Sequence, residues 1–271
     1  MKSRIHSLLL AITIFAIPQN LISCAQETSC PPQIAVPKDS ALLQRAIEAC
    51  LTSTNRGKSV GIFGGSLSCL PESESDKTQW KMHLAMDITT YGKGGYGFSS
   101  LQGSIQDQVN HATPKDIYIL WASTNDFTNN RPAGKPTDYT QEDGFPPTKR
   151  VTQCGGINYC IKRLKEINPN CKIFIFGSLP YFENDGGYNE YSKYVNETGH
   201  NFYHYVQQQE ACAEYHHVLF LDQFHIPILT PQNINLYYQA DRVHMTAQGY
   251  AELSPYHLYF LATEKEIQPI K

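Results

Sequence analysis

The chain has 271 residues, of which 41% are hydrophobic and 17% carry charged side chains. These values suit one large globular domain better than two small ones, and they exclude a disordered chain. The formal net charge of −3 becomes −5 if a leader containing Lys2 and Arg4 is removed. This acidic balance argues against nucleic acid, or an anionic membrane surface, as a partner recognised through charge.

The N-terminus has the features of an export signal. Lys2 and Arg4 precede an apolar run, residues 8–17, that is too short to span a bilayer. Residues 21–24, Leu-Ile-Ser-Cys, resemble a bacterial lipobox, in which Cys24 is lipidated and becomes the first residue of the mature protein. Ordinary signal-peptidase cleavage after Ala25 is the alternative. We therefore expect a leader at 1–24 and an exported protein of the bacterial cell envelope, which contacts the membrane through a lipid on Cys24 or not at all.

A tether and a helix are expected next. Residues 25–38 are polar and rich in proline, and 39–50 have helical apolar spacing with Ser40 as a candidate cap. We group residues 25–57 as this N-terminal segment and expect the main domain at 58–265.

Strands and helices then alternate along the chain. The expected strands are 59–63, 88–91, 117–121, 172–176 and 218–221, and the expected helices are 76–86, 99–109, 160–167, 190–214 and 246–263. Residues 128–148, with four prolines, are expected to form a polar loop. Alternation with continuous apolar strands predicts an α/β fold: a three-layer α/β/α sandwich with a mainly five-stranded parallel sheet. In such flavodoxin-like folds, functional sites collect at the carboxyl ends of the strands.

Eight cysteines are present, and an exported protein can form disulfides. Cys154 and Cys160 flank a stretch containing Gly-Gly and could close a small loop, although pairing cannot be read from sequence. His200 and His204 could bind a metal on one helix face, but no third ligand is evident. We expect no metal and no cofactor.

The residues that point to chemistry lie far apart. Ser66 follows the first expected strand, where the chain turns into a helix, and Asp241 precedes His244 by three residues on a turn before the last helix. A serine becomes a nucleophile when a histidine removes its proton, and a carboxylate orients that histidine. Ser66 by itself could equally be an inert helix cap. The Asp–His pair favours catalysis, with Ser68 as a weaker competitor.

At these residues the sequence resembles the SGNH (GDSL-type) hydrolase family. Four short blocks carry the resemblance in the family's order, those of Ser66, Gly95, Asn125, and Asp241 with His244. Each block is weak by itself, but the ordered set is strong. Two positions depart from the family's usual blocks: Gly65 stands where an Asp is usual, and Ser123 stands where a Gly is usual.

The resemblance implies a mechanism. Ser66, His244 and Asp241 would form the triad of an acyl-enzyme hydrolase. The backbone N–H groups of Ser66 and Gly95, with the side-chain amide of Asn125, would bind the oxyanion. Preorganised donors of this kind supply a large part of catalysis in acyl transfer.

Two further sequence patterns are weaker indications of function. Phe127 and Tyr181 follow strand ends and are candidate walls of a substrate pocket. Residues 92–97 match Gly-x-Gly-x-x-Gly, but the preceding strand is short and polar, so we expect no dinucleotide.

The function predicted from these features is an exported serine esterase. It would release a small acyl group, expected to be acetyl, from a small-molecule ester or from a carbohydrate or other glycan. The alternatives are a lipase or thioesterase for longer acyl chains, and a non-catalytic glycan-binding relative, which the departures at Gly65 and Ser123 would suit.

Overall fold

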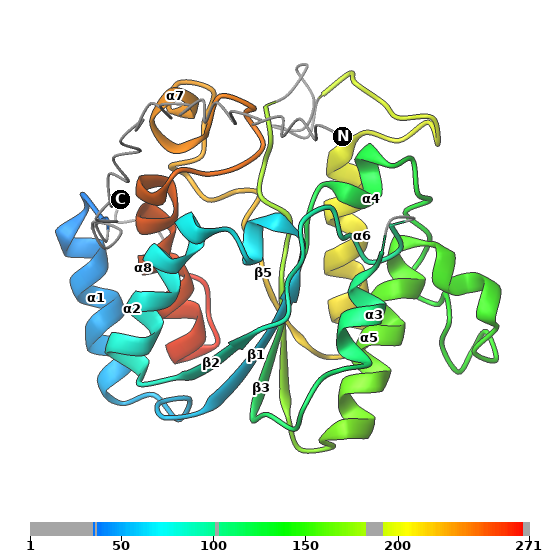
Figure 1. Cartoon of the computed structure of the whole chain (residues 1–271), viewed down its shortest axis with the longest axis horizontal. Coiled ribbons are helices and arrows are strands. Elements are labelled where there is room, and N and C mark those ends of the chain that lie inside the picture. Colours follow the sequence, from blue (N-terminus) through cyan, green and yellow to red (C-terminus); the bar gives the residue numbers. More distant parts are fainter. Residues whose placement is uncertain (1–34, 36, 101–102, 183–191, 268–271) are drawn as a thin grey trace, which may run out of the picture. The chain divides into compact units, whose positions relative to one another are not determined.

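A five-stranded parallel sheet forms the centre of the compact unit of residues 34–271 (Figure 1). The computed structural model describes residues 35, 37–100, 103–182 and 192–267. The strands are β1 Ser59–Gly64, β2 Asp87–Thr90, β3 Ile117–Trp121, β4 Lys172–Phe176 and β5 Leu219–Leu221. They lie in the order β2-β1-β3-β4-β5, and every pairing is parallel. The predicted sheet is confirmed, and β3 and β4 match their predicted bounds at both ends.

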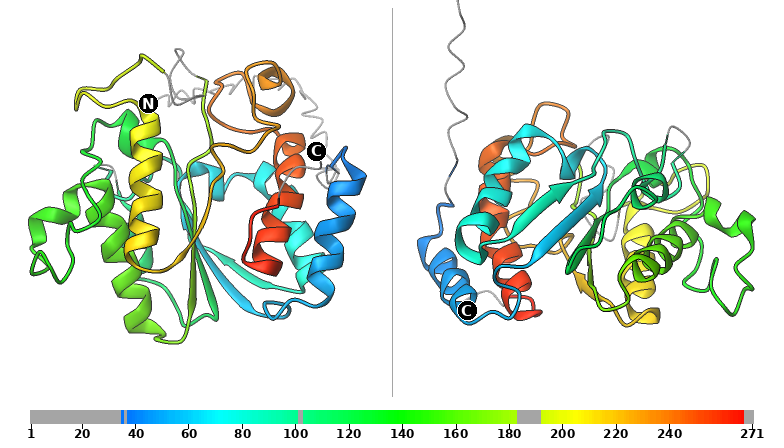
Figure 2. Two further views of the ribbon diagram at one scale, coloured as in Figure 1. Left: turned by 180° about the vertical axis from the view of Figure 1, so that it is seen from behind. Right: turned by 60° about the horizontal axis from the view of Figure 1, so that its bottom comes forward.

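Helices cover both faces of the sheet (Figures 1 and 2). One face carries α1 Ser40–Leu51, α2 Glu74–Leu84 and α8 Ala247–Thr263, and the other carries α3 Ile105–Val109, α5 Gln153–Ile167 and α6 Phe202–Tyr215. Successive side chains of a strand point to opposite faces, so Ile119 packs with the first group and Leu120 with the second. The three-layer α/β/α sandwich is therefore confirmed.

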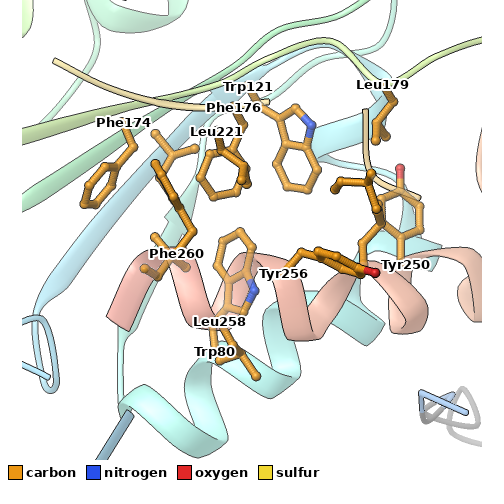
Figure 3. Packing of buried hydrophobic residues seen from close by; sticks show 14 of the residues in the cluster. Trp80, Trp121, Phe174, Phe176, Leu179, Leu221, Tyr250, Tyr256, Leu258 and Phe260 are labelled. Carbon is orange, nitrogen blue, oxygen red and sulfur yellow. The ribbon is translucent and has the colours of Figure 1, made fainter. Parts of the chain in front are cut away.

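Large aromatic residues fill the core between the sheet and α8 (Figure 3). Trp80 of α2 stacks on Trp121 of β3 with ring centroids 6.1 Å apart, and Phe176 meets both rings edge-on. Each such ring removes a large apolar area from water, which makes this layer a principal source of stability.

A polar pair is enclosed in the same core. Asp76 of α2 and His257 of α8 are both fully buried, with the His257 Nδ1 atom 2.6 Å from Asp76 Oδ2. Trp80 Nε1 donates to the other carboxylate oxygen, and Gln223 Oε1 lies 2.8 Å from His257 Nε2. Because each buried polar atom of the pair has a partner, the pair ties α2 to α8 without leaving a group unsatisfied.

The first helix belongs to the same compact unit as the sheet. Asp39, and not Ser40, caps α1 by accepting a hydrogen bond from the Leu42 N–H at 2.9 Å. Leu42, Ala46 and Cys50 then pack into the core that α8 shares. The compact unit therefore begins before residue 58, where we placed the start of the main domain.

Helix α5 begins seven residues earlier than predicted, which corrects the prediction for Cys154 and Cys160. Thr152 caps it by accepting from the Gly155 N–H at 3.0 Å. Gly155 is needed there, since an added Cβ would lie 1.7 Å from the Lys149 carbonyl oxygen. The two cysteines now stand on one helix about 9 Å apart along its axis, too far for a disulfide. All six described cysteines are free.

Two other predicted helices are shorter. Helix α6 begins at Phe202 and not at 190. Asn201 caps it, and Gly199, with φ +80°, has a backbone conformation that an α-helix cannot include. Helix α3 begins at Ile105 and not at 99, because Ser104 and Asp107 form a capping box at the later position.

The predicted leader, Cys24 and most of the tether lie outside the described residues. Within the described ranges, no helix is both long and apolar enough to cross a membrane.

Candidate active site

Several short helices lie among the longer elements: η1 Ser66–Ser68, η2 Pro71–Ser73, α4 Asn125–Thr128, η3 Pro147–Val151 and α7 Ile234–Tyr237. Two of them hold predicted site residues, Ser66 in η1 and Asn125 in α4, whereas Gly95, Asp241 and His244 lie in loops. Figure 1 shows α4 and α7 beyond the same end of the sheet. Ser66 is the first residue of η1, directly after β1, and His244 stands just before α8.

The structure brings Ser66, His244 and Asp241 into one hydrogen-bonded chain. His244 Nε2 lies 2.8 Å from Ser66 Oγ, and His244 Nδ1 lies 2.6 Å from Asp241 Oδ2. This geometry lets the hydroxyl donate to Nε2 while Nδ1–H donates to the carboxylate. The imidazole is therefore placed to take the serine proton.

The turn around Asp241 makes its side chain a fixed acceptor. Asp241 Oδ1 accepts hydrogen bonds from the N–H groups of Val243 and His244, both at 2.9 Å. Burial raises the pKa of Asp241, but the hydrogen bonds from His244 and Val243 outweigh it, and the net pKa lies below its ordinary value. Asp241 is thus ionised whenever His244 needs a counter-charge.

The turn that carries Asp241 and His244 is anchored to the segment that follows β4. Arg242 holds a left-handed conformation with φ +60°, and its carbonyl accepts from the Phe182 N–H at 2.9 Å. Tyr238 donates its hydroxyl proton to the Pro180 carbonyl at 2.6 Å. These contacts hold an unfavourable backbone conformation in place between Asp241 and His244.

Tyr250 supports the triad from α8, a role that the sequence did not reveal. Its buried hydroxyl donates to the Leu67 carbonyl at 2.7 Å, which fixes the residue after Ser66 to the helix that follows His244. No local pattern signals this contact, because the two residues stand 183 positions apart.

The alternative nucleophile, Ser68, does not reach the histidine. Its side chain is fully buried and donates to the Gly65 carbonyl at 2.8 Å. Gly64 leaves the space for this side chain, since an added Cβ there would lie 2.7 Å from Ser68 Oγ. Ser68 therefore shapes the turn that presents Ser66.

The predicted oxyanion donors come from three neighbouring loops. The Ser66 N–H is the first of its helix and has no intrahelical acceptor. Gly95, with φ +79°, lies in a loop that packs on the nucleophile turn, where the Lys93 N–H donates to the Gly64 carbonyl at 3.1 Å. Asn125 is close to the same turn, because its Nδ2 would lie 2.9 Å from a Cβ added at Gly65. Their role as donors stays a prediction.

Asp126 of α4 binds the segment that follows the glycine-rich residues 92–97. Its carboxylate is buried and accepts from the Phe98 N–H at 2.7 Å and from the Ser99 N–H at 2.8 Å. Burial raises the pKa of Asp126, and these hydrogen bonds oppose the shift. Gly97 is required beside it, since a Cβ there would meet the carboxylate at 2.7 Å. The sequence assigned Asp126 no role, although it belongs to the Asn125 block.

Phe127 and Tyr181 require a correction. They are 1% and 2% exposed and pack in a cluster with Phe202, Tyr205 and Phe224, with the partly buried Val243 against it. They do not form the walls of an open substrate pocket. Val243 lies between Asp241 and His244 and packs against this cluster, so Phe127 and Tyr181 support the turn that carries those two residues.

A second Asp–His turn of the same design follows β5. Asp222 Oδ1 accepts from the His225 N–H at 3.3 Å, and Asp222 Oδ2 lies 2.5 Å from His225 Nδ1. Among the described residues, no hydroxyl group bonds to His225 Nε2. The sequence repeats Asp-x-x-His here, but in the part of the chain that the structure describes no serine faces this copy.

The described residues contain no group of three His, Cys, Asp or Glu side chains placed to hold a metal. The rings of His200 and His204 stack with centroids 4.1 Å apart.

Comparisons with known proteins concern the family and the fold of the chain. A model of the GDSL-like lipase/acylhydrolase family matches residues 63–252, which include all three triad residues. The comparison with curated proteins gave no match.

Similar solved structures include a protein of Lactobacillus plantarum, with a TM-score of 0.61 and 14% identity over 76% of this chain and 97% of that one. A protein of Chitinophaga pinensis described as a possible lipase has a TM-score of 0.56 and 18% identity, over 73% of this chain and 95% of that one. A candidate GDSL-like lipase from Bacteroides uniformis has a TM-score of 0.51 and 14% identity, over 76% and 95%. These similarities concern the fold.

Proposed function

Because the chain belongs to the GDSL-like lipase/acylhydrolase family, whose members hydrolyse ester bonds, we propose that it is an exported serine esterase that removes short acyl groups, above all acetyl, from a carbohydrate. The observation that carries the catalytic part is the continuous chain from Ser66 Oγ through His244 to Asp241, with links of 2.8 and 2.6 Å. An assembled triad argues against a relative that merely binds glycans.

The reaction follows from these contacts. Ser66 Oγ attacks the ester carbonyl carbon while His244 Nε2 takes its proton, and the carbonyl oxygen becomes an oxyanion that the N–H donors of the site bind. His244 then gives the proton to the leaving alkoxide, which departs as the sugar hydroxyl and leaves an acyl group on Ser66. Water, deprotonated by His244, releases the acid and restores the serine.

The surroundings of the triad favour a short acyl group. The side chains of His244 and Asp241 are 29% and 47% exposed, so a bulky alcohol portion can approach from solvent. A lipase gains about 0.8 kcal/mol for each CH₂ group that its acyl pocket buries. Phe127 and Tyr181, which we expected as walls of a substrate pocket, are buried in the core and so bury no acyl chain.

A carbohydrate substrate and an extracytoplasmic location rest on the sequence of the N-terminus. An exported esterase meets the polysaccharides of the envelope and its surroundings, and a lipid on Cys24 would keep it at the membrane. The lipid anchor and the glycan are both parts of the proposal.

The test compares esters that differ in one property at a time. The chain without its leader should hydrolyse p-nitrophenyl acetate with a higher kcat/KM than p-nitrophenyl octanoate, and it should release acetate from one or more members of a panel of acetylated polysaccharides. The Ser66→Ala variant is the matched control and should release none. Preference for octanoate would indicate a lipase, and binding of glycans without turnover of any ester would indicate the non-catalytic relative.

A further inference from the structure

We propose that Ser123 is a positioning residue that allows Asn125 to serve as an oxyanion donor. This inference rests on the proposed esterase function. The observation behind it is a closed set of hydrogen bonds: Asn125 Nδ2 donates to the Tyr96 carbonyl at 3.0 Å and to Ser123 Oγ at 3.1 Å. Ser123 Oγ lies 3.0 Å from the same Tyr96 carbonyl and donates to it.

The Asn125 amide is therefore shared between two acceptors. The two acceptors lie 3.0 Å from each other, so they are about 60° apart as seen from Nδ2, whereas the two N–H bonds of a primary amide diverge by about 120°. One N–H therefore faces both acceptors, and the second is left for an oxyanion on the substrate. How well that second N–H serves depends on how firmly the amide is held.

Ser123 fixes the direction of the amide. A carbonyl oxygen has two lone pairs, so the Tyr96 oxygen accepts from Ser123 and Asn125 together, while Ser123 Oγ accepts from the amide as well. Without the hydroxyl, the amide would keep one acceptor there and could rotate about it, so its second N–H would be held less well in the direction of the oxyanion. Ser123 Oγ also accepts from the backbone N–H of Asn125 at 3.4 Å, at the start of α4.

Gly65 completes the arrangement by leaving room for it. A Cβ added at Gly65 would lie 2.7 Å from the Tyr96 carbonyl oxygen, 2.9 Å from Asn125 Nδ2 and 3.1 Å from Ser123 Cβ. Its φ of −82° is ordinary, so the requirement for glycine is one of space. The two departures from the family's usual blocks, at 65 and at 123, thus meet at one place and belong together.

The test is a double-mutant cycle on p-nitrophenyl acetate. Ser123→Ala should lower kcat about tenfold, as expected for one hydrogen bond, with KM unchanged. In the Asn125→Ala background the same substitution should change kcat less than twofold, because the residue it acts through is absent. A wild-type kcat in Ser123→Ala, or an equal loss in both backgrounds, would overturn the inference. Thermal melts of all four proteins show whether a loss reflects unfolding.

A second measurement distinguishes a failure of this inference from a failure of the proposed esterase function. The rate at which a p-nitrophenyl phosphonate labels Ser66, followed by intact mass, depends on the same donors but needs no ester turnover. If the wild type is labelled and hydrolyses no ester, the proposed function fails while the cycle is still measured on labelling rates. Gly65→Ala should also slow labelling. Gly94→Ala, where an added Cβ meets nothing within 4 Å, is the control and should leave labelling unchanged.

Discussion

Asp241 holds His244 at two points. One carboxylate oxygen lies 2.6 Å from the ring Nδ1, and the other accepts from the His244 backbone N–H at 2.9 Å. The ring and the backbone of the histidine are therefore fixed by the same side chain, which leaves Nε2 facing Ser66.

Asp241→Asn should lower kcat on the order of 10⁴-fold, because an amide favours the wrong imidazole tautomer and cannot stabilise the imidazolium. The matched control is Asp222→Asn, which makes the same change in the second Asp–His turn and should leave kcat near the wild-type value. Steady-state kinetics with p-nitrophenyl acetate measure both. Equal losses in the two variants would mean that the substitution acts through stability.

Ser66→Ala should abolish hydrolysis, since the loss of a nucleophile costs on the order of 10⁶ in turnover. Ser68→Ala removes a neighbouring hydroxyl that bonds to the Gly65 carbonyl, and it should keep most of the activity. Intact mass after phosphonate treatment checks the assignment independently. Labelling of Ser66→Ala would place the nucleophile elsewhere.

Asn125→Ala should lower kcat by about 10²–10³-fold, the usual loss for one oxyanion donor. KM should change little, because the donor acts on charge that develops in the transition state. Asn125→Asp should be at least as damaging, since a carboxylate repels the oxyanion. A lower melting temperature with unchanged turnover of the folded fraction would instead assign Asn125 a structural role.

The free energy of unfolding should depend on pH through His216. Burial, together with a smaller effect of the nearby His217, lowers the pKa of His216 from 6.5 to about 4. The Nε2 atom lies 2.8 Å from Asn158 Oδ1, whose own amide donates to two carbonyls, so Nε2 carries the proton of the neutral ring.

Since the folded state binds this proton more weakly than the unfolded chain, the contribution of His216 is complete above about pH 6.5 and is lost as the pH falls toward about 4. His216→Gln keeps an N–H donor but does not titrate. Urea midpoints between pH 4 and 7 should fall less steeply for this variant. Parallel curves for the two proteins would show that other groups cause the acid sensitivity.

Cys24→Ala should release the protein from the membrane fraction of a host that lipidates exported proteins, because the substitution removes the acyl chains that hold it there. Fractionation followed by mass spectrometry of the mature N-terminus measures this. A soluble wild-type protein that begins at Gln26 would contradict the lipid anchor and support ordinary cleavage after Ala25.

The sheet could be predicted closely from the sequence because its central strands are continuous apolar runs. The start of α5 could not, because it depends on the close approach of Gly155 to the Lys149 carbonyl of the preceding η3, a backbone contact that apolar spacing does not signal. The same division holds in the site. Ser66 and the Asp241–His244 turn carry local patterns, whereas the contact of Tyr250 with Leu67 and the role of Ser123 depend on segments that meet only in the folded chain.

The turn formed by Asp222 and His225 shows how little of a catalytic centre its most recognisable motif specifies. Four consecutive residues build an oriented imidazole twice in this chain, each time from hydrogen bonds within the turn itself. Among the described residues, the two copies differ in one contact: His244 Nε2 lies beside the hydroxyl of Ser66, 178 positions away. The hydrolase site therefore depends mainly on the topology, which brings Ser66 to one of the two Asp–His turns. The motif by itself does not distinguish the two turns.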